Sequence, residues 1–136
     1  LLMGKKMLIL KKKILEQNSK IKIFYTLYRT KNIDEFKDKK ILAFSGIGNH
    51  DNFVDLLKDN KINIIKEIHF PDHYNYSDKD LENLIVKAKK NDAILLTTEK
   101  DYLRINENYR KNIKYLKIKS EIENQKELIR EIKNFI

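Results

Sequence analysis

Several residue types that mark common functional sites are scarce or missing in this chain of 136 residues. It has no cysteine, which excludes a disulfide framework and cysteine-based metal sites. Its three glycines, Gly4, Gly46 and Gly48, cannot form the G-x-x-x-x-G-K-[ST] loop that holds nucleotide phosphates. No apolar run approaches the roughly 20 residues needed to cross a bilayer. With 41% hydrophobic residues, the composition is that of a globular domain.

Acidic residues are outnumbered by basic ones, 20 to 29, so the net charge is +9. Such an excess can indicate binding to nucleic acid or to an anionic membrane. Very few of the basic residues are arginine, however, although the planar guanidinium suits phosphate better than an ammonium does. This bias favours a solvated lysine surface that reflects AT-rich codons. A basic face for an anionic membrane or a phosphate stays as the alternative, and no nucleic-acid partner is expected.

Strand-like and helix-like patterns alternate along the chain. We expect strands at 21–28, 41–45, 62–70, 93–98 and 113–119, and helices at 3–18, after Asn49, after Ser77 and at 122–136. Ser77 and Asp80 form a capping box at the start of one helix. This alternation predicts an α/β fold of three layers, with a mostly parallel sheet and flanking helices. We expect residues 1–20 to be a linker or N-terminal helix and 21–136 to be the domain.

The unusual residues of the chain lie in three loops that follow predicted parallel strands. These loops are "SGIGNHDNF" after 41–45, "PDHYNYS" after 62–70 and "TTEKDYLR" after 93–98. Open parallel sheets bind ligands at the carboxyl ends of their strands. We therefore expect the three loops to meet at one edge of the sheet.

The first loop contains Gly46, Gly48 and Asn49. Two glycines between a strand and a helix allow a tight turn whose N–H groups can hold an anion. The same glycines could serve only the backbone angles of the turn, and Asn49 could cap the helix. The pattern is G-x-G alone, with Asp51 where a dinucleotide fingerprint would have its third glycine.

The second loop contains the only proline, Pro71, followed by Asp72 and His73. A histidine has an intrinsic pKa near neutrality, so His73 could transfer protons, or it could be an ordinary exposed loop residue. His50 and His69 are expected to be structural.

The third loop places Glu99, Lys100 and Asp101 directly after Thr98. Lys100 could neutralise a phosphate, or the charges could form ion pairs that hold the loops in register. No metal site is predicted, because three scattered histidines without cysteine lack ligand spacing.

Together, "ILAFSGIGNHDNF", "FPDHYNYSDKDL" and "LLTTEKDYLR" resemble the C-terminal half of the tetraacyldisaccharide 4′-kinase family over residues 20–136. The resemblance implies transfer of the ATP γ-phosphate to the 4′-hydroxyl of a tetraacyldisaccharide 1-phosphate, a lipid A precursor. It also implies Mg²⁺, a location in the cytoplasm at the inner membrane of a Gram-negative bacterium, and a P-loop in an N-terminal half that this chain lacks. His73, beside Asp72, matches the family's catalytic histidine, which pairs with an aspartate of that half.

The same resemblance places Thr98, Glu99, Lys100 and Asp101 near the cleft, with Gly46, Gly48 and Asn49. His50 stands where the family commonly has proline. We expect a fragment or split subunit that binds no ATP or Mg²⁺ alone and is inactive without the P-loop half. Two alternatives stay open: a non-catalytic module that binds an anionic membrane or a partner, and an unrelated small α/β enzyme that uses Asp72 and His73 as acid and base.

Overall fold

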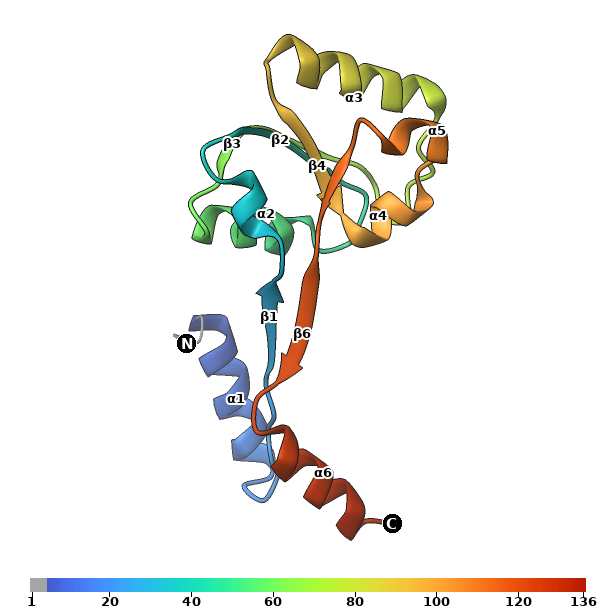
Figure 1. The fold of residues 1–136 in the computed structure, drawn as a ribbon. Helices are drawn as coiled ribbons and strands as arrows, with labels where there is room; N and C mark the ends of the chain where they lie inside the picture. The colour runs from blue at the N-terminus through green and yellow to red at the C-terminus, as the bar shows by residue number, and fades with distance from the viewer. Residues whose placement is uncertain (1–4) are drawn as a thin grey trace. The chain divides into compact units, whose positions relative to one another are not determined.

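The computed structural model describes residues 5–136, whose backbone contacts divide them into two units. Arg29–Lys119 form one, which we call the core unit, and the described residues before and after it form the other, the terminal unit. The chain passes from one unit to the other within β1 (Thr26–Thr30) and β6 (Ile118–Ile122), which pair as a two-stranded sheet (Figure 1). A domain boundary at residue 20 stays a prediction, because units of contact need not fold independently.

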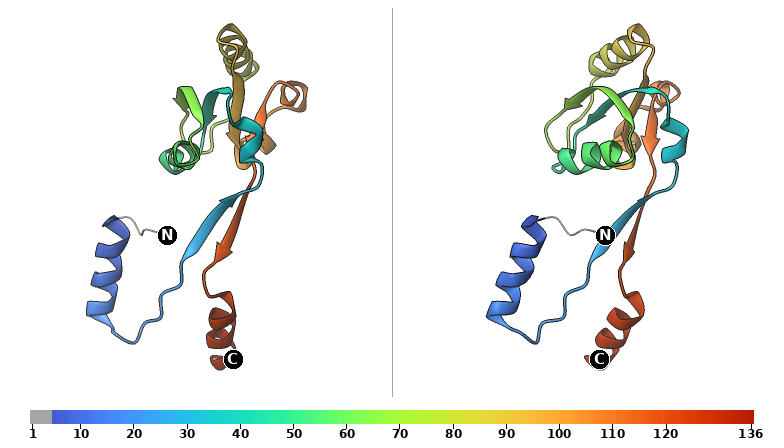
Figure 2. Two further views of the ribbon diagram at one scale, coloured as in Figure 1. Left: turned by 60° about the vertical axis from the view of Figure 1, so that its left-hand side comes forward. Right: turned by 90° about the vertical axis from the view of Figure 1, so that its left-hand side faces the viewer.

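The core unit is built on a four-stranded sheet. Its strands are β2 (Lys40–Ser45), β3 (Asn63–His69), β4 (Ile94–Thr98) and β5 (Lys114–Leu116), in the order β3-β2-β4-β5 (Figure 2). All three strand pairs are parallel. The predicted parallel sheet is therefore confirmed, and the apolar sequence of β2 is explained by its place between two neighbours.

Helices cover both faces of this sheet. Alternate residues of β2 point to opposite faces, so Ile41 and Ala43 join one hydrophobic cluster and Leu42 and Phe44 join the other. The first cluster includes α2 (His50–Asp59) and a 3-10 turn at Ile33–Phe36, and the second includes α3 (Asp78–Lys90), with α4 (Glu99–Arg104) and α5 (Glu107–Arg110) packed against it. The predicted three-layer α/β architecture is confirmed.

Side-chain caps fix where two helices of the core unit begin. Ser77 and Asp80 form the predicted capping box at α3. Thr98 accepts a hydrogen bond from the backbone N–H of Asp101 and so starts α4 at Glu99. The sequence analysis described this segment only as a loop after a predicted strand, so the helix there corrects the prediction. Asn49 occupies the N-cap position of α2, but its side chain makes no capping hydrogen bond.

The terminal unit contains α1 (Lys5–Gln17) and α6 (Gln125–Asn134). The strand predicted at 21–28 is wrong in its bounds, because β1 begins only at Thr26, where β6 supplies a pairing partner. The single strand predicted at 113–119 is also wrong in its bounds. That stretch is divided between β5 and the start of β6, which belong to two different sheets. None of the helices within residues 5–136 is both long and apolar enough to span a membrane.

Candidate functional site

The strand order brings the three loops to the carboxyl edge of the sheet. From β2 the chain leads through α2 to β3 on one side, and from β3 it returns past β2 to β4 on the other. The loops after β2 and β4 therefore leave these neighbouring strands in opposite directions. Open α/β sheets bind ligands in the crevice between two such loops. The candidate site lies at this position.

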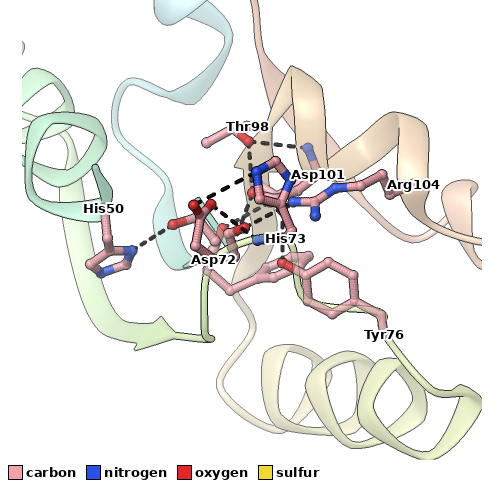
Figure 3. A network of polar contacts seen from close by, with 11 residues as sticks. His50, Asp72, His73, Tyr76, Thr98, Asp101 and Arg104 are labelled. Atoms are coloured by element: carbon pink, nitrogen blue, oxygen red, sulfur yellow. Dashed lines mark hydrogen bonds and ion pairs between the residues drawn. The ribbon is translucent and has the colours of Figure 1, made fainter. Parts of the chain in front are cut away.

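Asp101 is fully buried there and accepts hydrogen bonds from all three loops (Figure 3). Its Oδ2 accepts from the backbone N–H of Gly46 at 3.1 Å and from Thr98 Oγ1 at 2.7 Å. Its Oδ1 accepts from the Tyr76 hydroxyl at 3.0 Å and from Arg104 Nη2. A buried carboxylate is costly unless it is paired and hydrogen-bonded, and these four donors satisfy both oxygens.

Gly46 connects this carboxylate to the loop of His73. The carbonyl oxygen of Gly46 accepts hydrogen bonds from Arg104 Nη2 and from the backbone N–H of His73, both at 2.9 Å. A Cβ atom on Gly46 would lie 3.0 Å from Tyr74 Cβ and 3.0 Å from the Tyr76 hydroxyl. Only glycine therefore allows the two loops to approach this closely.

His73 projects outward from the site. Its backbone has a φ of 57°, in the left-handed region that non-glycine residues rarely adopt. Its side chain is 88% exposed, and its Nε2 lies 3.7 Å from Oδ2 of Asp72. The backbone N–H of His73 also donates to Oδ1 of Asp72 at 3.0 Å. The sequence alone did not require this pair to interact; the turn places the two side chains side by side (Figure 3).

Gly48 lies beside the same carboxylate, because a Cβ on Gly48 would be 3.3 Å from Oδ2 of Asp72. The first loop thus approaches the second at two points. Gly46 supports the backbone of His73, and Gly48 leaves room for Asp72. A larger side chain at position 48 would push against the carboxylate that faces the histidine.

His50 and His69 form a separate pair. His50 is buried, its Nδ1 lies 2.6 Å from Ser45 Oγ, and its ring stacks on that of His69 at 4.5 Å. Burial lowers the pKa of His50, and the charge of His69 lowers it further. His50 is thus buried beside Ser45 of β2, whereas His69 is the exposed last residue of β3, and a structural role for both stays a prediction.

Tyr76 keeps its proton and therefore acts as a donor. Burial raises the pKa of its hydroxyl, and the neighbouring Asp101 carboxylate raises it further. Its ring packs edge-on against Phe44 of β2 and against Phe70. The hydroxyl is thus held by the hydrophobic core at the position where Asp101 needs a donor.

The residues predicted from the loops fall into two groups. Thr98, Asp101 and Gly46 are buried in the hydrogen-bonded network, whereas Gly48, Asn49, Glu99 and Lys100 are exposed, as are Asp72 and His73. Tyr76 and Arg104 belong to the network but were missed by the sequence patterns. Arg104 follows Asp101 by three residues, the spacing of a helical ion pair, so a prediction of α4 would have indicated it.

Neither a P-loop nor a cluster of metal ligands is found in the described part of the chain. Within residues 5–136, no group of three or more acidic or histidine side chains is placed to hold a metal ion. The glycines that a phosphate-binding P-loop requires are also missing from the sequence. The residues present therefore lack the groups with which a P-loop site holds ATP and Mg²⁺.

Comparison with known proteins assigns a family to this arrangement. The sequence model of the family "Tetraacyldisaccharide-1-P 4'-kinase" matches residues 5–136. A tetraacyldisaccharide 4'-kinase of Pelagibacter ubique is 48% identical over 124 residues, which is 90% of this chain and 39% of that protein. One from Rickettsia typhi is 52% identical over 75 residues, or 55% of this chain and 23% of that protein.

A solved structure agrees. The fold resembles LpxK from Aquifex aeolicus, described as an "apo" form in complex with ATP, with a TM-score of 0.55 and 25% identity. The match covers 88% of this chain and 40% of that one. The chain thus spans about two fifths of the Pelagibacter ubique and Aquifex aeolicus proteins, as expected for one half of such an enzyme. On these grounds the chain belongs to the tetraacyldisaccharide-1-P 4'-kinase family.

Proposed function

We propose that this chain forms the C-terminal α/β part of an enzyme that transfers the γ-phosphate of ATP to the 4′-hydroxyl of a tetraacyldisaccharide 1-phosphate. The names of its relatives and its family membership support this reaction. In the complete enzyme, His73 would take the proton of the acceptor hydroxyl, and Asp72 would orient the imidazole and stabilise its charged form. Gly48, Asn49, Glu99 and Lys100 would line the cleft.

The observation that carries this proposal is the position of His73. The side chain is 88% exposed, yet its backbone is fixed by hydrogen bonds to Gly46 and Asp72 in a left-handed turn. A left-handed φ also occurs at the surface residues Asp38, Lys61, Asp92 and Asn124, so what distinguishes His73 is that two hydrogen bonds fix the backbone of so exposed a side chain. The histidine is thus held in place but open to a group that comes from outside the chain.

The phosphate donor site would belong to another part of the enzyme. Phosphoryl transfer depends on positioning and on charge stabilisation by a P-loop, its lysine and Mg²⁺. We propose that these are supplied by a P-loop half, as is an aspartate that meets His73, and that the present chain alone neither binds ATP with Mg²⁺ nor transfers phosphate. The lipid substrate would place the enzyme at the cytoplasmic face of the inner membrane.

The test is a hybrid kinase in which this chain replaces the matching segment of the Pelagibacter ubique protein. ATP-dependent 4′-phosphorylation of the tetraacyldisaccharide 1-phosphate is measured for the hybrid and for the 136-residue chain by itself. We expect product from the hybrid and none from the chain. Phosphorylation by the isolated chain, or a folded hybrid without activity, would overturn the proposal.

A second candidate function is docking at an anionic membrane. In α1, Met7, Leu8, Ile9 and Leu10 are each about half exposed, and Lys12 beyond them is exposed as well. Apolar and cationic side chains on one helix suit the boundary of an anionic bilayer. Binding of the purified chain to phosphatidylglycerol vesicles, weakened by salt and absent with phosphatidylcholine, would support this function. Indifference to both vesicles would exclude it.

A further inference from the structure

We infer that Asp101 is a positioning residue for His73, acting through Arg104 and Gly46. The inference rests on the proposed function, in which the position of His73 matters because His73 takes a proton from the substrate. Of the acidic residues in the "TTEKD" loop, Asp101 differs from Glu99 in being fully buried. It therefore cannot touch a substrate, and its effect on the reaction must pass through the residues that it holds.

The contacts that link Asp101 to His73 begin at the backbone N–H and carbonyl groups of Gly46. Asp101 accepts from the N–H of Gly46 at 3.1 Å, and Arg104, which pairs with Asp101, donates to the carbonyl of Gly46 at 2.9 Å. The acidic residue and the arginine thus hold both polar groups of one glycine. Because the interior has a low effective dielectric constant, these charge-assisted bonds are stronger than bonds between neutral groups.

The second step leads from Gly46 to His73. The carbonyl that Arg104 fixes also accepts the backbone N–H of His73 at 2.9 Å. That hydrogen bond supports a left-handed φ of 57°, which an isolated histidine would avoid. Without it, the backbone of His73 could relax toward the ordinary regions, and the imidazole would point elsewhere.

The third step is the closure of the second loop. Tyr76 donates to Asp101 at 3.0 Å and lies three residues after His73. Asp101 thereby holds the loop at Tyr76, while Gly46 holds it at His73. No rotation of the loop is possible without breaking one of these bonds or leaving the buried carboxylate short of a donor, which is costly.

Asp101→Asn tests the inference because it keeps the shape and removes the charge. All four partners of Asp101 are donors, so the amide NH₂ of the asparagine must face at least one of them. Glu107→Gln is the matched control: Glu107 also pairs with an arginine three residues later, Arg110, but its side chain is 85% exposed. The control should leave every readout unchanged.

The first readout uses the 136-residue chain alone and needs no activity. Amide hydrogen exchange at His73 should become roughly 2- to 10-fold faster in Asp101→Asn, the loss expected for one weakened hydrogen bond. Because Asp72 also accepts from this amide, the comparison is repeated in an Asp72→Ala background, where Gly46 is the remaining acceptor. Unchanged exchange in a folded Asp101→Asn chain would overturn the inference.

The second readout is a double-mutant cycle in the hybrid kinase. Asp101→Asn should lower kcat on the order of 10²-fold, the cost of a misplaced catalytic group, and leave KM for both substrates unchanged. In a His73→Ala background the same substitution should cost nothing more, because its effect passes through the histidine. If the losses in kcat from Asp101→Asn and His73→Ala add in full in the double variant, Asp101 acts only on the fold, and the inference is wrong.

Tyr76→Phe covers the case in which Asp101→Asn does not fold. It removes one of the four donors and keeps the aromatic ring in the core. We expect faster amide exchange at His73 and a lower kcat in this variant too, with smaller effects than in Asp101→Asn. If neither changes in Tyr76→Phe, the inference is contradicted. If the wild-type hybrid is inactive, the proposed function fails, whereas the exchange readout still decides the role of Asp101.

Discussion

The core unit and the terminal unit differ in whether they contain a hydrophobic core. Every buried hydrophobic side chain in residues 5–136 belongs to the core unit, between Ile33 and Leu116. In the terminal unit, no described side chain is buried, and α6 leaves Ile129, Ile132 and Phe135 exposed. A helix gains most of its stability from packing an apolar face. The core unit therefore has the means to fold by itself, whereas the described residues of the terminal unit bury no apolar side chain that would stabilise its helices.

The candidate site lies in the unit that has the hydrophobic core. Asp101, Gly46 and His73 all lie in the core unit, on segments that directly follow strands of its four-stranded sheet. The site consequently inherits its geometry from the packed sheet and not from the terminal helices. Four substitutions test this contrast, and they are ordered from the largest expected effect to the smallest.

Leu57→Ala should have the largest effect on stability. Leu57 of α2 is fully buried, and loss of such a side chain lowers the free energy of unfolding by about 2–5 kcal/mol. Leu10→Ala in α1 is the matched control, because Leu10 is also helical but 54% exposed. Urea unfolding followed by circular dichroism compares the two. Equal losses would show that the terminal unit has a core of its own.

Ser77→Ala should lower the free energy of unfolding by about 1 kcal/mol, since it removes the side-chain oxygen that caps α3. Asn49→Ala serves as the comparison, because Asn49 stands at the N-cap of α2 without a side-chain capping bond. The same urea titration measures both. An equal loss from Asn49→Ala would contradict the assigned capping geometry.

His50 should make the core unit less stable in mild acid. Its pKa in the folded chain is lowered by burial below the value of about 6.5 that the unfolded chain has. The unfolded state therefore binds more protons as the pH falls through about 6.5 toward the folded pKa, and stability is lost in that window. The fall in Tm between pH 7.5 and pH 5.5 should be smaller in His50→Asn. An identical fall in both proteins would contradict this role.

Lys22→Gln should have the smallest effect. Lys22 forms an ion pair with Glu131 at 2.7 Å in the terminal unit, but its side chain is 52% exposed, and exposed pairs contribute little. We expect no measurable change in the Tm of the core unit by calorimetry. A clear decrease would show that the terminal unit contributes to the stability of the core unit.

Much of the fold could be predicted because its signals are local. The apolar runs of β2 and β4, the capping box at Ser77 and the glycines after β2 all act within a few residues. The predicted strand at 21–28 failed because a strand exists only where a partner pairs with it, and β6 lies almost a hundred residues away in sequence. Pairing of that kind leaves no local pattern.

The candidate site was predictable in its position but not in its connections. Strand order placed the three loops at one edge, and His73 was indicated by the loop and by resemblance. Lys100 and Asp101 are neighbours in one motif, yet Lys100 is exposed and Asp101 is buried. This difference depends on how α4 is oriented. The role of Tyr76 likewise depends on a contact between two loops, which only three-dimensional packing defines.

The most direct test of the account is the effect of His73→Ala on the hybrid kinase. Turnover of the tetraacyldisaccharide 1-phosphate is measured at saturating ATP for the wild-type and substituted hybrids. If His73 takes the proton of the acceptor hydroxyl, kcat falls by about 10²–10⁴-fold, the range for loss of a general acid–base group. Unchanged turnover in a folded His73→Ala hybrid would contradict this role and remove His73 from the reaction.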